Sequence, residues 1–587
     1  MSTFTKLMVL LVALALIPFH LNPDAFLADD AYFYLQLADN IRLGHGSTFH
    51  QITPTNGYHP LWLLCCVVGA FISGGSKTVF LQLMGFVQDG LFLGSLVLLW
   101  KCAQKLNLET AVQDDKVMQG FESESIVIGG DHSQMVKAPP IRNDYGSKNC
   151  VNLSSSTAVS RLNLMFYSLG VLSLALVMVI AGGLRLFESH LSLTLQLAIL
   201  LLFLRITTQS AKKLVSLKTM ALTGVVMGLC MLSRLDTVFF CGVVWCFLVP
   251  VIWKQSKKWT SLLALTVPPC ILLIPYLSWN YVMFGHLVPI SGVIKSIMPQ
   301  VDLSYARLGL HGGPAVIAAV CLLICSLVVE KSRINRLFFS ILLCSVSLYA
   351  LYIAMFSIGS QWHYTTVYIA ITFGLMRVAT AVWQSLKNSA FLGNTANLFR
   401  TVCHSLTLAA FVCLIGVSFL KTQYHFSMAL VLAGKESLTQ ESAKMPAAKQ
   451  IAAKLKQTLP QGTAIFMFDY PGMVAYYSGM KIVPFDGLMN DFAYNDLIAE
   501  MGISAYAEKN DIHYVIAPIA IPQRTYDRLS LIIKQGPNQA TDIHVFTPIG
   551  DRAAGSFSLP PEQIVFRMPN PVSPIANEFP EVALWSL

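Results

Sequence analysis

The sequence predicts a polytopic α-helical membrane protein that ends in a soluble α/β domain. Only 12% of the 587 residues are charged, whereas an ordinary soluble domain carries about 25%. Mean hydropathy is +0.59, and uncharged runs such as Leu162–Leu184 have the length, about 20 residues, that spans a bilayer. After Lys421, charged residues alternate with short strand-like runs such as Ala464–Phe468. These observations exclude soluble enzymes and fibrous, collagen-like or disordered proteins.

About eleven apolar segments are expected to cross the membrane. The run from 61 to 103 is broken by Gly74–Lys77, so we interpret His59–Ser73 as an interfacial or re-entrant helix and count one crossing after it. The predicted crossings cover about 5–22, 79–103, 162–182, 190–207, 219–234, 236–253, 259–279, 312–330, 335–356, 364–384 and 401–420.

Lysine and arginine predict the orientation, because loops rich in these residues stay in the cytoplasm. With the N-terminus inside, every dense basic cluster falls in a cytoplasmic loop. Twelve crossings, the alternative, would place the later clusters outside. The basic residues behind the net charge of +9 are therefore explained by the orientation of the chain in the membrane, and they indicate no nucleic-acid partner. The basic loops are Lys101–Arg161, Lys212–Lys213, Lys254–Lys258, Lys331–Arg336 and Lys387–Arg400.

Composition also predicts the domain organisation. Residues 1–424 form the membrane module, whose first outer loop covers 20–60. The polar stretch at about 107–160 is expected to be a disordered cytoplasmic insertion. Residues 425–587 form the soluble α/β domain, which this topology places in the periplasm of a bacterial inner membrane.

The first outer loop carries the adjacent carboxylates Asp29 and Asp30. Two such groups at a membrane surface repel each other and lose hydration, so a substrate hydroxyl, cation or metal is expected to engage them. A carboxylate there can act as a general base on a hydroxyl nucleophile. The structural alternative is that Asp30 caps a helix over 31–43, but this reading leaves Asp29 unexplained.

Four later outer loops carry further candidates. Arg185 and Glu188 lie in one short turn, where they suit a phosphate or a metal or anchor a helix end. Arg234 and Asp236 join two apolar helices, where they form either a structural ion pair or part of a polar site. Lys295 is a candidate phosphate contact or a snorkelling lysine, and His363 is structural or lines the substrate site.

These five loops predict one polar site at the outer face. The inward loops carry only basic clusters and the insertion. A transporter would more often show internal repeats and broken helices with polar residues near the midplane. A transporter or flippase of lipid-linked glycans, and a non-catalytic scaffold for envelope assembly, nevertheless stay open as alternatives.

The first loop resembles that of bacterial GT-C-type glycosyltransferases. The resemblance is carried by Asp29–Tyr34, Ala38–Ile41, Gly44–Gly46 and Thr55–Trp62. The group it resembles most uses polyprenyl-phosphate sugars and includes the terminal arabinofuranosyltransferases of the mycobacterial cell wall. Protein O-mannosyltransferases and lipid A aminoarabinose transferases are more distantly similar.

Later segments extend the resemblance in the same order along the chain. Gly183–Glu188 resembles a Gly-Met-Glu-Thr pattern, and Ser233–Asp236 resembles a Thr-Arg-Pro-Asp pattern. Asn280–Ser291 is similar to an Asn-Tyr-x-x-Phe-Gly segment, and Phe468–Asn490 is similar to the start of the C-terminal domain.

The resemblance implies a GT-C fold and an inverting transfer from a lipid-linked donor. Asp29 or Asp30 would deprotonate the acceptor hydroxyl of an envelope glycan, lipid or protein, and polyprenyl phosphate would leave. Positive charge replaces a general acid for such a leaving group. The candidates for it are Arg185, Arg234 and Lys295.

Other residues receive supporting roles from the same resemblance. Tyr58 and His59 would line the donor-phosphate or acceptor pocket, together with Asp236 and His363. The acceptor-binding candidates in the C-terminal domain are Asp469, Asp486 and Asn490. No cofactor is firmly implied; a divalent cation is an option, with Asp29 and Glu188 as candidate ligands.

Overall fold

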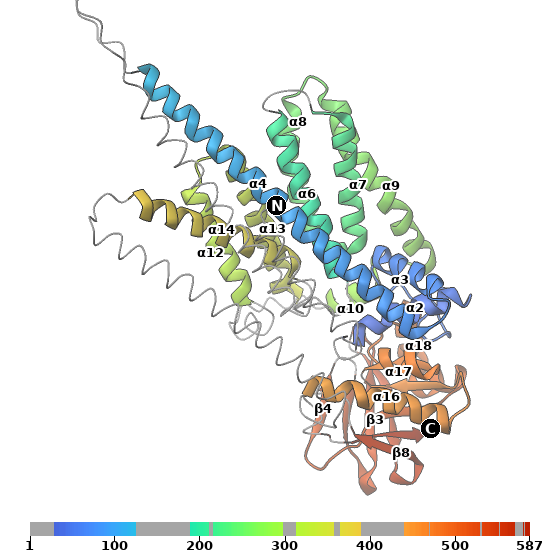
Figure 1. Cartoon of the computed structure of the whole chain (residues 1–587). Helices are drawn as coiled ribbons and strands as arrows, with labels where there is room; N and C mark the ends of the chain where they lie inside the picture. Colours follow the sequence, from blue (N-terminus) through green and yellow to red (C-terminus); the bar gives the residue numbers. More distant parts are fainter. Residues whose placement is uncertain are drawn as a thin grey trace, which may run out of the picture.

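A computed structural model describes most of the two expected modules (Figure 1). A bundle of helices forms one module, and a mixed α/β unit lies at one end of it. The described residues are 27, 29–124, 188–210, 215–296, 313–356, 364–388, 440–468, 470–528, 531–550, 552–569, 579 and 581–587.

Among the described residues, five helices are long and apolar enough to cross a membrane. These five segments, together with three shorter apolar helices, coincide with predicted crossings. The predicted crossings at 5–22, 162–182 and 401–420 lie outside the described residues, so the count of eleven stays a prediction. The helices are α2 (Asp29–Arg42), α3 (Pro60–Ile72), α4 (Lys77–Glu124), α6 (Ser189–Ser210), α7 (Leu217–Ser233), α8 (Val238–Trp253), α9 (Lys258–Phe284), α10 (Ile290–Ser296), α12 (Gly313–Val329), α13 (Arg333–Phe356) and α14 (Thr365–Asn388).

Helices α7 and α9 approach closely because α7 carries glycine at the contact. A Cβ on Gly224 would collide with the carbonyl oxygen of Leu265, and one on Gly228 would meet Pro269 and Leu272. Small residues allow such backbone contact between membrane helices, where dispersion and not the hydrophobic effect drives packing.

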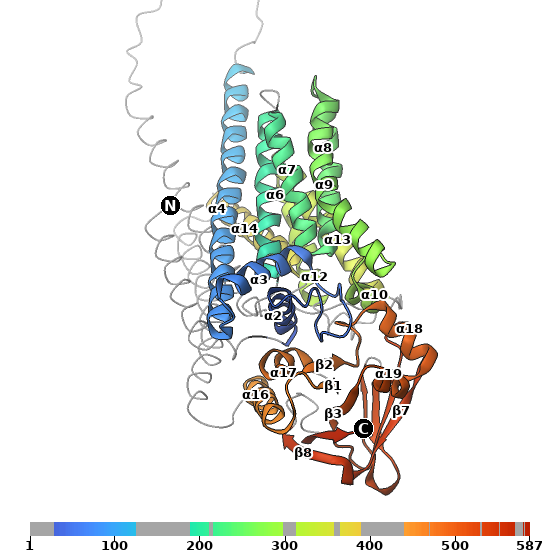
Figure 2. The ribbon, with the colours of Figure 1, turned by 90° about the vertical axis from the view of Figure 1, so that its right-hand side faces the viewer.

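Helix α3 differs from the crossing helices in direction. Figure 2 shows it lying across the bundle, while α4 runs along the bundle. Its exposed side chains Leu64, Val68, Phe71 and Ile72 follow helical spacing on one side. This arrangement fits the interfacial helix expected at His59–Ser73. Helix α4 is apolar as far as Leu106 and continues to Glu124, so the start of the expected insertion is helical.

The C-terminal unit packs helices against two sheets. The five-stranded sheet has the order β2-β1-β3-β9-β8; β1 is parallel to β2 and β3, whereas β9 is antiparallel to its neighbours. The second sheet is antiparallel, in the order β4-β5-β6-β7. The elements are α16 (Gln440–Thr458), β1 (Ala464–Met467), α17 (Pro471–Ser478), β2 (Lys481–Pro484), α18 (Phe492–Met501), α19 (Ile503–Lys509), β3 (Ile512–Pro518), β4 (Thr525–Arg528), β5 (Leu531–Gln535), β6 (Thr541–Phe546), β7 (Ala553–Leu559), β8 (Ile564–Pro569) and β9 (Glu581–Ser586).

The first loop joins this unit to the bundle through its Thr55-Asn56-Gly57 segment. The hydroxyl of Thr55 donates to the carbonyl oxygen of Asn490 at 2.8 Å. Gly57 lies so close to the backbone of Leu488 that a Cβ would collide with its carbonyl oxygen. The motif therefore requires a residue without a side chain at this position.

Asn56 links the same loop to the segment after α9. Its amide nitrogen donates to the Asn280 side chain at 3.2 Å, and its amide oxygen accepts from the Ile290 N–H at 3.0 Å. Asn280 in turn donates to the carbonyl oxygen of Leu287. Asn56 and Asn280 are fully buried, so these bonds satisfy amides that would otherwise be costly to bury.

The protein is predicted to lose stability against unfolding in acid, because the first loop buries His50. The side chain is 1% exposed, and burial lowers its pKa from 6.5 to about 4, a shift that Asn490 partly opposes. A histidine whose pKa is lower in the folded than in the unfolded protein favours folding in full above pH 6.5. This stabilisation is lost as the pH falls towards 4. The loss amounts to about 3 kcal/mol.

Thermal unfolding of the detergent-solubilised protein at pH 7.5 and pH 4.5 measures this effect. His50→Gln should reduce the difference between the two midpoints, because the titrating group is gone. His45→Gln, at an exposed position of the same loop, is the control. An unchanged pH dependence in His50→Gln would contradict the assignment.

Candidate functional site

Four charged or titratable side chains meet where the first loop, α6 and the α7–α8 turn come together. We call His59, Glu188, Arg234 and Asp236 the charged cluster. The sequence predicted all four as site residues in three separate outer loops, and the structure brings them into contact.

Local backbone structure explains their placement. His59 directly precedes Pro60, the first residue of α3, and has the extended conformation that a residue before proline favours. Glu188 precedes the first residue of α6. Arg234 ends α7 in an extended conformation, with φ of −158°, and Asp236 follows in a short 3-10 turn. The break between α7 and α8 therefore turns two charged residues inward.

Arg234 is the centre of the charged cluster. Its Nη2 and Nε donate to the two oxygens of Asp236 at 2.7 and 3.1 Å, and its Nη1 donates to Glu188 at 2.9 Å. The Arg234 side chain is 3% exposed and that of Glu188 is 5% exposed. His59 lies at the edge, with Nε2 at 3.7 Å from Glu188. Because one guanidinium neutralises two carboxylates, Arg234 is already engaged and would have to exchange partners to hold a phosphate.

Asp29 contacts the C-terminal unit. Its two carboxylate oxygens accept the N–H groups of Gly472 and Met473 at 2.9 and 2.8 Å. These are the first free N–H groups of α17, which begins at Pro471. Asp29 thus caps a helix that lies more than 400 residues later in the chain.

Asp30 lies on a different side of α2 from Asp29. Residues four apart share a helix face, which places Asp30 beside Tyr34. The hydroxyl of Tyr34 accepts the N–H of His59 at 3.2 Å. Burial raises the pKa of Tyr34 well above its usual value, and the charge of Glu188 adds to the rise. The face of α2 that carries Asp30 and Tyr34 is therefore the one turned towards the charged cluster.

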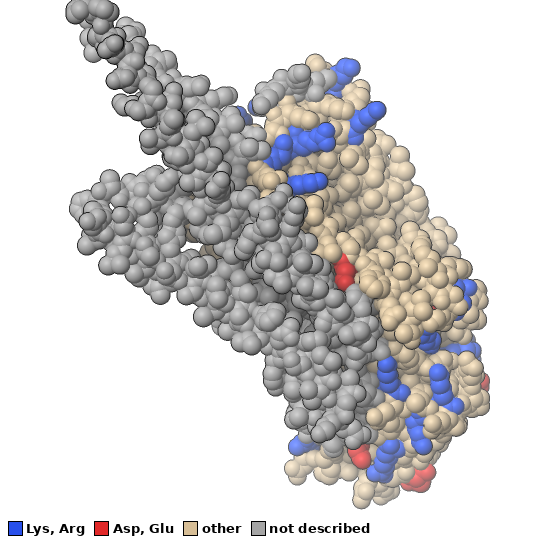
Figure 3. Space-filling view, in the orientation of Figure 1, with Lys and Arg blue, Asp and Glu red and all other residues tan. Residues whose placement is uncertain are grey.

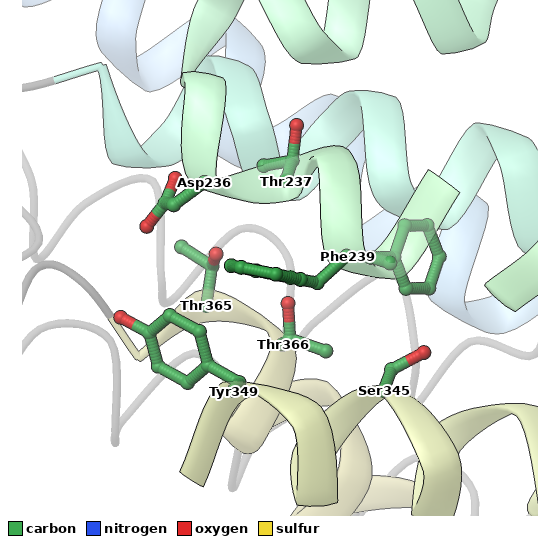
Figure 4. Close-up of a pocket in the computed structure, with 8 residues that line it drawn as sticks. Asp236, Thr237, Phe239, Ser345, Tyr349, Thr365 and Thr366 are labelled. Atoms are coloured by element: carbon green, nitrogen blue, oxygen red, sulfur yellow. The ribbon is translucent and has the colours of Figure 1, made fainter. Parts of the chain in front are cut away.

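A small pocket opens beneath Asp236, between the start of α8 and helices α13 and α14 (Figure 4). Its walls combine one carboxylate with hydroxyl groups and aromatic rings. The hydroxyl of Ser345 is buried without a hydrogen-bond partner among the described residues. The lining residues are Asp236, Thr237, Phe239, Phe240, Ser345, Tyr349, Thr365 and Thr366.

A buried glutamine orders two of the pocket hydroxyls. The Gln196 amide donates to Thr365 at 3.0 Å and accepts from Thr366 at 2.8 Å. Sequence reasoning missed Gln196 and Tyr34. Polar residues inside an apolar helix were the available signal for Gln196, and helical spacing from Asp30 was the signal for Tyr34.

The other predicted residues fall into three groups. Tyr58 is buried, and its hydroxyl meets that of Ser47 at 3.0 Å. Asp486 accepts the N–H of Leu488, and Asn490 donates to the carbonyl oxygen of Pro484, so both shape the loop that receives the first loop. Arg185, His363 and Asp469 lie outside the described residues, and Lys295 is described only as part of α10.

The candidate metal ligands Asp29 and Glu188 have separate partners, namely α17 and Arg234. Within the described ranges, no three His, Cys, Asp or Glu side chains gather as a metal site requires.

Comparison with known proteins identifies the fold. No protein-family model matches the chain, and no curated protein matches it. ArnT from Cupriavidus metallidurans in the apo state superposes with a TM-score of 0.51 at 12% identity, covering 88% of this chain and 93% of ArnT. ArnT bound to undecaprenyl phosphate gives 0.49 at 12% identity, covering 89% and 96%.

The oligosaccharyltransferase of Archaeoglobus fulgidus, tethered with an acceptor peptide, gives a TM-score of 0.47 at 12% identity, covering 88% of this chain and 69% of that protein. These neighbours are GT-C glycosyltransferases. The superposition on ArnT, with the apolar helices, shows that this chain has a membrane GT-C fold, as the first-loop resemblance predicted.

Removal of the central guanidinium is predicted to destabilise the bundle strongly. Arg234→Met would leave two largely buried carboxylates without a cation, which costs about 3–5 kcal/mol. Arg42→Met is the matched control, because Arg42 pairs with Asp39 in a more exposed position and such a pair contributes at most about 1 kcal/mol. Thermal unfolding in detergent compares the two variants, and equal midpoints would contradict the role given to Arg234.

Proposed function

We propose that the chain is an integral membrane glycosyltransferase. It transfers a sugar from a polyprenyl-phosphate donor to a hydroxyl of an envelope glycan, lipid or protein, with inversion at the anomeric carbon. The supporting observation is the GT-C fold, whose first loop carries the carboxylate pair and contributes His59 to a buried charged cluster. ArnT, whose fold this chain shares, binds undecaprenyl phosphate.

The two carboxylates are proposed to have different roles. Both oxygens of Asp29 already accept N–H groups of α17. Asp30 shares its helix face with Tyr34, next to His59. We therefore assign the general-base role to Asp30 and a supporting role to Asp29.

The reaction moves one proton and exchanges one bond at the anomeric carbon. Asp30 takes the proton of the acceptor hydroxyl as its oxygen bonds to that carbon. The bond from the carbon to the phosphate oxygen breaks on the opposite face, and polyprenyl phosphate leaves as an anion. Because phosphate is already a good leaving group, positive charge near it suffices, and Arg185 and Lys295 are the proposed sources.

The charged cluster is proposed to shape the site and not to take part in proton transfer. Arg234 holds Glu188 and Asp236 in fixed positions, and Glu188 faces His59. Such fixed charges avoid reorganisation during the reaction.

The site is proposed to face the periplasm. The α7–α8 turn with Arg234 lies at one end of α8, and Lys254, Lys257 and Lys258 follow its other end. In Figure 3, lysine and arginine are seen at both ends of the molecule; over the C-terminal unit Asp and Glu accompany them, whereas at the far end of the bundle the charged side chains visible among the described residues are lysine and arginine. The positive-inside rule assigns that end to the cytoplasm, which leaves the site and the C-terminal unit outside.

Asp30→Asn is predicted to abolish transfer, with a loss of about 10²–10⁴-fold, because an amide cannot accept the proton. The assay incubates purified protein with undecaprenyl-phosphate-linked hexoses and pentoses and with envelope extracts, and follows the release of undecaprenyl phosphate. Asp39→Asn, on the same helix but paired with Arg42, should keep full activity.

Full activity in both Asp30→Asn and the double variant with Asp29→Asn would overturn the catalytic assignment. Movement of the intact donor across sealed vesicles, without a new glycosidic product, would instead support a flippase.

A further inference from the structure

Helix α17 is the element of the C-terminal unit that meets the first loop most directly. Figure 2 shows α17 next to α2, at the end of the bundle. It is only eight residues long, and its rings pack on α2: the Tyr32 ring centroid is 5.6 Å from that of Tyr476 and 5.9 Å from that of Tyr477.

The N-terminal end of α17 receives a negative charge. Asp29 accepts two of its N–H groups, as described above. The approach depends on Gly472, since a Cβ at this position would collide with the carbonyl oxygen of Asp29 and crowd Phe33. This end of the helix is therefore shaped to fit one carboxylate.

The C-terminal end of α17 receives a positive charge. The ammonium group of Lys77, at the start of α4, donates to the carbonyl oxygen of Tyr476. The same ammonium lies 4.6 Å from the centre of the Tyr476 ring. The Tyr476 hydroxyl returns a bond to the Lys77 carbonyl oxygen at 3.4 Å.

Both charges match the polarity of the helix. Free N–H groups leave the N-terminus of a helix partly positive, and free carbonyl groups leave its C-terminus partly negative. Asp29 begins α2 and Lys77 begins α4, so the segment that contains α2 and α3 is bounded by the two charges. The match also fixes direction, because α17 turned end for end would meet the wrong charge at both ends.

We propose that Asp29 and Lys77 form a clamp that docks α17 and thereby positions Asp30. They are positioning residues, because they act through the docked helix and the backbone shared with Asp30. The expected effect on activity rests on the proposed function. The docking of α17 can be measured independently of that function.

Hydrogen exchange of the full-length protein in detergent measures the docking. Asp29→Asn and Lys77→Met should each speed exchange of the α17 amides on the order of tenfold, because each removes one charge matched to the helix dipole. Lys449→Met is the control: its ammonium lies 4.7 Å from the Tyr477 ring, but Lys449 comes from α16 of the C-terminal unit itself. Exchange at α17 should stay unchanged in this variant.

Gly472→Ala tests the same docking without altering any charge. The added methyl group should push α17 away from Asp29 and reproduce the exchange pattern of Asp29→Asn. Gly94→Ala adds the same group to α4, where no atom lies within 4 Å, and should have no effect. The charge-swapped Asp29→Lys, Lys77→Asp double variant should dock worst, because each charge then faces the wrong end of α17. Rescue in this variant would contradict the proposal.

Activity then separates positioning from simple folding. If wild-type protein transfers sugar, Asp29→Asn and Lys77→Met should lower kcat several-fold with the donor KM unchanged, and Asp29→Glu should recover part of the loss. If wild-type protein shows no transfer, the proposed function fails, while the exchange data still decide the clamp. Unchanged α17 exchange in Asp29→Asn, Lys77→Met and Gly472→Ala would overturn the clamp.

Discussion

The pairing of buried charge around Arg234 is the constraint on which the end of the bundle at the α7–α8 turn depends. A guanidinium that is 3% exposed can persist there only while its partners stay in place. Those partners come from two places in the chain, Glu188 before α6 and Asp236 before α8, and His59 before α3 meets Glu188. Desolvation therefore fixes three helix ends relative to one another, and Asp236 also lines the pocket between α8, α13 and α14.

The first loop links this buried centre to the C-terminal unit by a different kind of bonding. Thr55 and Asn56 use neutral hydrogen bonds, and Gly57 allows backbone contact with Leu488. Asp29 adds a charged contact with the free N–H groups of α17. Because these contacts all lie within one loop, a displacement of the C-terminal unit would move α2 and with it Asp30.

The sequence predicted the class of fold and all four residues of the charged cluster, because both depend on local patterns. Apolar length marks crossings, and an arginine beside an aspartate between two such runs must be paired or functional. The partners that lie far apart in the chain could not be predicted. Glu188 and Arg234 lie 46 residues apart, and Asp29 meets Gly472 443 residues later, so only the packed chain reveals these contacts. The Thr-Asn-Gly segment was noticed as a family resemblance, and its structural role became visible only in contact with Asn280 and Asn490.

The adjacent carboxylates show most clearly what three-dimensional structure adds. The sequence offers Asp29 or Asp30 as the general base and does not choose between them. On a helix, adjacent residues point about 100° apart, so the two side chains face different surroundings. Asp29 meets free N–H groups, which need an acceptor whatever the chemistry of the site. Asp30 shares its face with Tyr34, whose hydroxyl is bonded to the backbone of His59. The adjacent carboxylates therefore have different surroundings: Asp29 joins the first loop to the C-terminal unit, and Asp30 shares a helix face with Tyr34.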